Sequence, residues 1–211
     1  MTCKGFLESL AEARAIPGGG AAAAYGASVG LALLEKIARL EAKRHAGIAE
    51  SEAFWEVLLA RLMRISGRLA HLRDEDGRAY ATLAESRKIS GSGSEFYYRA
   101  LRYATEVPME IMKEVPRALA CAKDVGGRCK GHLLSDLLAA CELLSGGSRG
   151  ASCIVEANLR LFADRPVKES LESELHRIKR EVLHCLEEIR ELALSRLGPS
   201  DERTTKPKRA E

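Results

Sequence analysis

Residues 21–34 are the most constraining feature of the sequence, because they read AAAAYGASVGLALL and carry no charge over about four helical turns. A helix without a polar face must be surrounded by protein, and its small residues let neighbouring backbones approach closely. We therefore expect a central, buried helix over residues 20–46. Its second half becomes charged, which brings Lys43 and Arg44 to solvent or to a cleft.

The rest of the chain has the 3.6-residue periodicity of amphipathic helices and almost no strand pattern. Further helices are expected over residues 2–13, 50–87, 95–125, 132–144, 150–162 and 170–196. The stretch 50–87 is one long helix or two abutting ones. Pro108 and Pro116 should bend or split the helix that contains them, and Gly146 and Gly147 should end another. The predicted fold class is all-α, a multihelical domain with long helices packed around buried central helices.

The 211 residues, 46% of them hydrophobic, are enough for one domain, which we place at residues 1–197. Residues 198–211 are polar and charged and lack apolar anchors, so they are predicted to be a disordered basic tail. The net charge of +3 arises from 33 basic and 30 acidic residues spread along the chain. This balance predicts no nucleic-acid partner.

Cysteine usage and the N-terminal sequence bear on the cellular compartment. The six cysteines show no C-x-x-C spacing, so we expect reduced, structural thiols. The start of the chain, MTCKGFLESL, lacks the apolar core of a signal peptide, and the apolar run at 18–34 is short for a membrane span. These features predict a cytoplasmic protein with no membrane anchor.

Several short motifs occur in a defined order along the chain. They are F-L-x-x-L-A at 6–11, P-G-G-G at 17–20, D-E-D-x-x-A-Y at 74–80, A-T-E-V-P-M at 104–109, Ser135-Asp136, and Gly150-Ala151 leading to Asn158. As an ordered set they resemble the formiminotetrahydrofolate cyclodeaminase and methenyltetrahydrofolate cyclohydrolase family, over about residues 5 to 165.

The resemblance implies a methenyltetrahydrofolate cyclohydrolase-like fold, a homodimer, and a folate site in a cleft near the dimer interface. It also implies an enzyme, either a cyclodeaminase or a cyclohydrolase, whose substrate is a tetrahydrofolate derivative. Each reaction passes through a tetrahedral intermediate at a one-carbon unit and requires proton transfers. The site therefore needs a positioned acid or base, and we predict no metal.

Asp76 and Asp136 are the predicted catalytic residues, because each matches a family position and a carboxylate in a partly desolvated cleft can have its pKa raised towards neutrality. Asp76 lies four residues before Tyr80, so the two side chains share one helix face. From spacing alone, Asp76 could equally belong to a solvated acidic patch with its two acidic neighbours. The pair Ser135 and Asp136 could instead cap a helix.

Pro17, Gly18, Gly19 and Gly20 are predicted to bind substrate, since they place bare amide groups at the start of the central helix, where an anion or a carbonyl oxygen is favoured. Alternatively, the glycines only let the chain turn tightly into a crowded interior. The other predicted substrate-binding residues are Lys43, Arg44, Glu106, His132, Ser135 and Asn158. The two basic residues among them could pair with a glutamate tail, although a solvated helix end explains them equally well.

Lys130 and His132, which stand just before the Ser-Asp pair where the family often has asparagines, depart from the family pattern, as does Ile154. A polar-to-aliphatic change can delete a substrate hydrogen bond. The alternative function is therefore a catalytically inactive folate-binding or helical interaction scaffold of the same fold, which would bind a reduced folate without turnover. A third is a partner- or nucleic-acid-binding protein whose basic tail gives salt-dependent binding.

Overall fold

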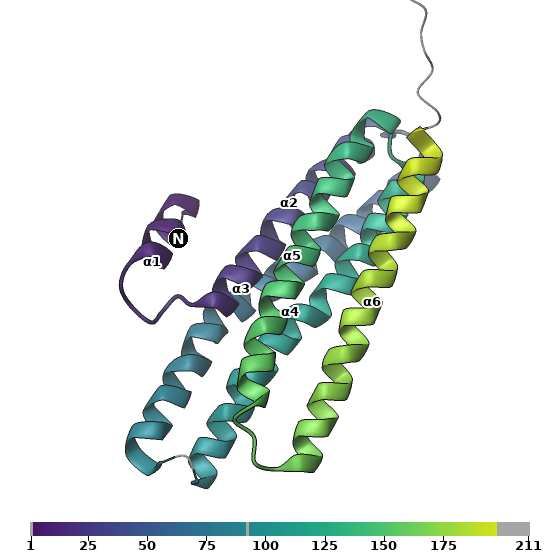
Figure 1. The fold of residues 1–211 in the computed structure, drawn as a ribbon. Coiled ribbons are helices and arrows are strands. Elements are labelled where there is room, and N and C mark those ends of the chain that lie inside the picture. Colours follow the sequence, from purple (N-terminus) through teal and green to yellow (C-terminus); the bar gives the residue numbers. More distant parts are fainter. Residues whose placement is uncertain (1, 92, 198–211) are drawn as a thin grey trace, which may run out of the picture.

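The computed structural model describes residues 2–91 and 93–197, and within these ranges the chain is all-α, as predicted (Figure 1). The elements are α1 (Cys3–Ala11), α2 (Gly19–Arg44), α3 (Ala49–Ser90), α4 (Glu95–Arg128), the short 3-10 helix η1 (Gly131–Leu133), α5 (Leu134–Leu159) and α6 (Arg165–Leu197). The predicted tail, residues 198–211, lies outside the described residues.

Helix α2 is the central helix that its composition predicts, and it packs against α5, α3 and α4. The expectation that protein surrounds residues 21–34 on every side was wrong, because Val29 is 46% exposed and Ala32 is also exposed, so one face of the helix is not covered within the chain. By length and composition it is the one described helix that could cross a membrane, with a mean hydropathy of 1.2. Half of its most apolar window is buried inside the bundle, as in the core helix of a globular domain, so this feature is weak evidence for a membrane span.

Helix α5 runs without a break through Gly146 and Gly147, so the prediction of two helices, 132–144 and 150–162, was wrong. The reason is tertiary. A Cβ atom on Gly147 would lie 2.8 Å from the carbonyl oxygen of Ala23 and 2.9 Å from the amide nitrogen of Ala27. The glycine is therefore required by the close approach of α5 to α2, and it does not mark a helix end.

Helix α4 continues through both Pro108 and Pro116, so they do not split it. Helix α3 is one continuous helix, which decides between the two alternatives for residues 50–87. Helix α6 begins at Arg165, earlier than predicted, because the side chain of Asp164 accepts a hydrogen bond from the amide of Val167 at 3.1 Å.

Helix α1 is shorter than predicted and lies beside the bundle formed by the five long helices (Figure 1). The ring of Phe6 stacks on that of Tyr25 in α2, with centroids 4.4 Å apart. This contact attaches the N-terminal segment close to the start of the central helix.

The five cysteines whose side chains are described are free, as predicted for structural thiols. Cys121, Cys129 and Cys141 are buried. Burial raises the pKa of Cys141 to about 12, so this thiol stays protonated at neutral pH.

Candidate functional site

A cavity of 320 Å³ opens at the N-terminal end of α2, between α3 and α5. Its volume is at the lower end of the range of small-molecule sites. It is lined by Ala15, Ile16, Gly18, Gly19, Gly20, Asp76, Gly77, Tyr80, Leu83, Arg87, Ala104, Ile154, Ala157 and Asn158. Five of the predicted site residues, from three helices and the turn before α2, therefore face one concave space.

Asp76 links α3 to the first turn of α2. Its Oδ2 accepts a hydrogen bond from the amide of Ala21 at 2.9 Å, and the side chain is only 9% exposed. Since the N-cap residue Gly18 has no side chain, Asp76 caps α2 from a different helix. Burial raises the pKa of Asp76, and the Ala21 amide partly offsets this by stabilising the carboxylate.

The carboxylate of Asp76 can reach α2 only because Gly20 has no side chain. A Cβ atom at that position would lie 2.5 Å from the Asp76 Cγ atom and closer still to Oδ1. Gly19 is next to Ile154 of α5, whose Cδ1 atom would lie 3.0 Å from an added Cβ. The glycines thus let a carboxylate from α3 and an aliphatic side chain from α5 approach the end of α2.

The acidic cluster at residues 74–76 divides among three environments. Asp74 is exposed and pairs with Arg73 at 2.9 Å. Glu75 accepts a hydrogen bond at 3.1 Å from the hydroxyl of Tyr103 in α4. Only Asp76 lines the cavity, together with Tyr80 one helical turn later, so the solvated-patch interpretation fits Asp74 and not Asp76.

Asn158 reaches the cavity from α5 and compensates for a proline. Pro108 has no amide hydrogen, which leaves the carbonyl of Ala104 without its helical partner, and Asn158 Nδ2 donates to that carbonyl at 2.9 Å. Glu106 accepts a hydrogen bond from Arg102 at 2.7 Å and is not among the lining residues. At the cavity, Pro108 therefore acts through the Ala104 carbonyl that it leaves unpaired, and Glu106, predicted to bind substrate, does not line this space.

Arg87 lines the cavity and was missed in the sequence. A usable signal existed, because Asp76, Tyr80, Leu83 and Arg87 follow i, i+4, i+7 and i+11 spacing on one face of α3. The guanidinium lies 5.7 Å from the centre of the Tyr97 ring and forms no ion pair with a described residue.

Asp136 lies far from this cavity within one chain. It is on the first turn of α5 and pairs with Lys36 of α2 at 3.0 Å. Lys36 follows Ala21 by fifteen residues on α2, which corresponds to about 22 Å along the helix axis. The expectation that Asp136 and Asp76 meet around one ligand is therefore not met inside a single chain.

The remaining predicted residues gather at the same distant end as Asp136. Lys43, His132 and Ser135 are exposed there, and Arg44 pairs with the buried Glu41. None of these residues lines the cavity at Asp76, because that cavity lies at the N-terminal end of α2 and these residues lie near its C-terminal end. Pro17 precedes the lining glycines and lines a smaller adjacent cavity.

Comparisons with known proteins agree on one family. The family model described as "Formiminotransferase-cyclodeaminase" matches residues 2–177 of this chain. The chain is similar to formimidoyltransferase-cyclodeaminase of Mus musculus, with 28% identity over 173 residues, covering 79% of this chain and 32% of that protein. The Rattus norvegicus protein is 27% identical over the same length and coverage. The chain thus spans about a third of the length of these relatives.

A solved structure has the same fold. The crystal structure of formiminotetrahydrofolate cyclodeaminase from Thermotoga maritima superposes with a TM-score of 0.84, covering 92% of this chain and 96% of the other. The sequences are 22% identical, so this likeness establishes the fold alone. The all-α architecture expected from the sequence is confirmed.

Proposed function

The chain belongs to the formiminotransferase-cyclodeaminase family, and from this premise we propose that it is a folate-dependent one-carbon enzyme, a formiminotetrahydrofolate cyclodeaminase. In this reaction a folate nitrogen attacks the formimino carbon, the tetrahedral intermediate collapses, and ammonia leaves. The observation that carries the proposal is the buried Asp76 carboxylate, held against the start of α2 in a cavity of small-molecule size.

Asp76 has the properties required of a proton carrier. The Ala21 amide holds Oδ2, whereas Oδ1 accepts no hydrogen bond from the described residues and is free to contact a ligand. Because burial raises the pKa of Asp76, the carboxyl group holds its proton closer to neutrality than an ordinary aspartate does. In the proposed reaction it takes the proton from the attacking nitrogen and transfers it to the amino group on the tetrahedral carbon, which then leaves as ammonia.

Three other lining residues suit a reduced folate. The ring of Tyr80 is half-exposed at the cavity and can stack on a pterin. Arg87 has free guanidinium donors for a carboxylate of the folate tail. Asn158 uses its amide nitrogen on the Ala104 carbonyl, which leaves its side-chain oxygen available as an acceptor for a pterin N–H group.

The test follows methenyltetrahydrofolate absorbance after purified protein is mixed with formiminotetrahydrofolate, and in a separate arm with methenyltetrahydrofolate. We expect formation in the first arm; consumption in the second arm alone would indicate a cyclohydrolase. Asp76→Asn, which keeps an oxygen acceptor for the Ala21 amide, should lower kcat by about 10²–10⁴-fold. The matched control Asp74→Asn removes an exposed carboxylate two residues away and should leave the rate unchanged.

Ile154 is the observation that supports the alternative function, a catalytically inactive folate-binding scaffold. Its aliphatic side chain lines the cavity beside Gly19, at a position where the resemblance implies a polar group. An inactive scaffold would bind a reduced folate without converting it. If a reduced folate binds but neither substrate is turned over, the scaffold is the better description, and Ile154→Asn should then restore turnover if the missing polar group is the cause. If no reduced folate binds at all, both proposals are wrong.

Asp136 can act at this cavity only when a second copy of the chain brings it there, as in the homodimer that the resemblance implies. Asp136→Asn should then lower kcat, and a mixture of Asp136→Asn and Asp76→Asn chains should regain activity that neither variant has alone. Unchanged activity of Asp136→Asn would remove Asp136 from the proposed mechanism and leave Asp76 as its proton carrier.

A further inference from the structure

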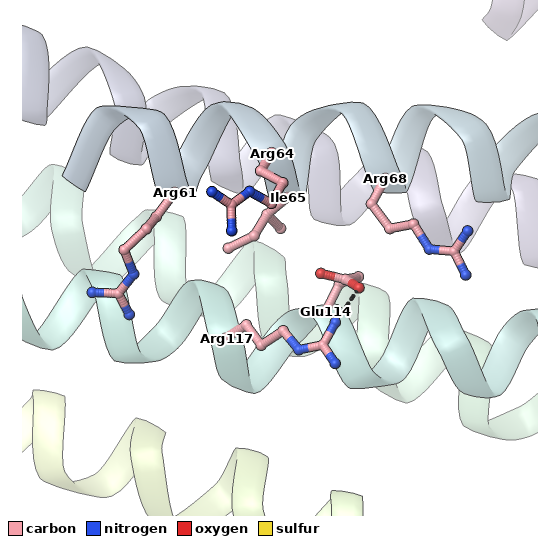
Figure 2. A pocket seen from close by; sticks show the side chains of 6 residues that line it. All are labelled: Arg61, Arg64, Ile65, Arg68, Glu114 and Arg117. Atoms are coloured by element: carbon pink, nitrogen blue, oxygen red, sulfur yellow. Dashed lines mark hydrogen bonds and ion pairs between the residues drawn. The ribbon is translucent and has the colours of Figure 1, made fainter. Parts of the chain in front are cut away.

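A second cavity, of 480 Å³, lies between α3 and α4 and shares no lining residue with the candidate site. It is lined by Arg61, Arg64, Ile65, Arg68, Glu114 and Arg117 (Figure 2). Four of the six side chains are guanidinium groups. This concentration of one cation type in a concave site is unlike the rest of the chain, where acidic and basic residues nearly balance.

The arginines are arranged by helix geometry. Arg61, Arg64 and Arg68 follow i, i+3 and i+7 spacing on α3, so they share one face and span about 10 Å along the helix axis. Figure 2 shows them arrayed along α3, with Arg117 and Glu114 on the neighbouring stretch of α4. The cavity thus presents a row of cations on one wall and a fourth cation on the other.

The acidic neighbours leave most of these donors available. Arg61 contacts Asp124 at 3.3 Å and Arg68 contacts Glu110 at 3.5 Å, and in both pairs the side chains remain exposed in part, so the pairs are weak. Arg64 forms no ion pair or hydrogen bond with a described residue. Each guanidinium carries five N–H donors, of which a single carboxylate contact uses only one or two.

Glu114 is the one acidic residue of the cavity wall, and it is only 3% exposed. It pairs with Arg117 at 2.5 Å and so holds that guanidinium at the cavity. Burial raises the pKa of Glu114, which reflects the cost of keeping a carboxylate charged there. Removing its charge would free Arg117 for another anion.

We propose that this cavity binds an oligophosphate anion, such as pyrophosphate or a triphosphate group. Planar guanidinium forks match the oxygens of phosphate bidentately, and a row of them along a helix suits an anion whose charges are strung along a short chain. The lining contains no aromatic side chain on which a nucleobase could stack, and Ile65 is its one apolar side chain. The site therefore recognises the phosphate chain itself.

Isothermal titration calorimetry of the full chain with inorganic tripolyphosphate and with pyrophosphate tests the proposal. Arg64→Gln should weaken binding by about ten- to a hundredfold, the loss expected for a charge-assisted hydrogen bond to a phosphate oxygen. Arg64 is exposed and unpaired, so this variant should fold normally. The matched control is Arg160→Gln, which removes an exposed arginine at the end of α5. Glu114→Gln should tighten binding.

Three results would overturn the proposal. The first is the absence of tripolyphosphate binding to the wild-type chain at millimolar concentration. The second is equal weakening by Arg64→Gln and Arg160→Gln, which would mean diffuse attraction to the whole surface. The third is equally tight binding of citrate, a polycarboxylate, which would show that the cavity does not select phosphate.

Discussion

Gly20→Ala is the most direct test of how the fold builds the candidate site. The new methyl group would lie 2.5 Å from the Asp76 Cγ atom and closer to Oδ1, well inside van der Waals contact. Since Gly20 is on the first turn of α2 and cannot move without moving that helix, the carboxylate has to leave. The perturbation therefore breaks the Asp76 cap of α2 without changing any polar residue.

The change that Gly20→Ala causes in the free energy of unfolding has two opposing contributions. Losing the hydrogen bond from the Ala21 amide to a charged, buried acceptor costs about 1.5–3 kcal/mol. Replacing glycine by alanine in a helix favours folding by about 0.5–1 kcal/mol. We therefore expect a net destabilisation of about 1–2 kcal/mol, which for a chain of this length lowers Tm by about 2–8 °C.

The assay is urea unfolding of Gly20→Ala beside Gly26→Ala, a substitution in the same helix. A Cβ atom on Gly26 would have no neighbour within 4 Å, so this control should be stabilised by about 0.5–1 kcal/mol. The two variants should shift the free energy of unfolding in opposite directions. If Gly20→Ala is stabilised as much as Gly26→Ala, the close approach of Asp76 to α2 does not depend on the glycine and our account of the site is wrong.

Three further predictions concern the same region. Gly147→Ala should destabilise the fold by about 1–3 kcal/mol, because the added Cβ would meet the backbone of α2. Gly146→Ala is the control, since a Cβ atom there would have no neighbour within 4 Å, and thermal unfolding compares the two variants. Asn158→Leu should cost about 1 kcal/mol in urea unfolding, since it leaves the Ala104 carbonyl unpaired next to a cavity that water can enter. Because the pKa of Asp76 is raised in the folded chain, the folded chain keeps a proton that the unfolded chain releases at lower pH. The contribution of Asp76 protonation to stability is therefore fully present below the ordinary aspartate pKa and is lost as pH rises through the raised value. Asp76→Asn should flatten that part of the stability–pH curve, and an unchanged curve would contradict the raised pKa.

Helical periodicity predicted most of the fold, because the apolar face of a helix is a local property of the chain. It misplaced the ends of α1 and α6, and its larger errors lie at glycines and prolines. Gly147 was interpreted as a helix end, yet it permits contact between α5 and α2. Pro108 was expected to interrupt α4, yet Asn158, fifty residues later, satisfies the carbonyl that the proline leaves unpaired. The residue pattern of one helix cannot reveal that a side chain from another helix will satisfy its unpaired carbonyl.

The candidate site was also predicted only in part. Residue types and their order along the chain pointed to Gly18, Gly20 and Asp76, and these residues line one cavity. The same reasoning grouped Asp136 with them, although α2 holds the two carboxylates at opposite ends. Spacing within a helix specifies which side chains share a face, but it contains no information on where two helices cross.

The amino-acid sequence by itself therefore determined that this chain is helical, that residues 20–46 form the central helix, and that bare amides stand at the start of α2. Only the tertiary structure decided that a carboxylate from α3 accepts a hydrogen bond from one of those first-turn amides, that of Ala21, and that four arginines from α3 and α4 line a separate cavity. The physical reason is that periodicity and propensity act over one or two turns, whereas burial, pKa shifts and cavities arise from contacts between helices distant in the chain.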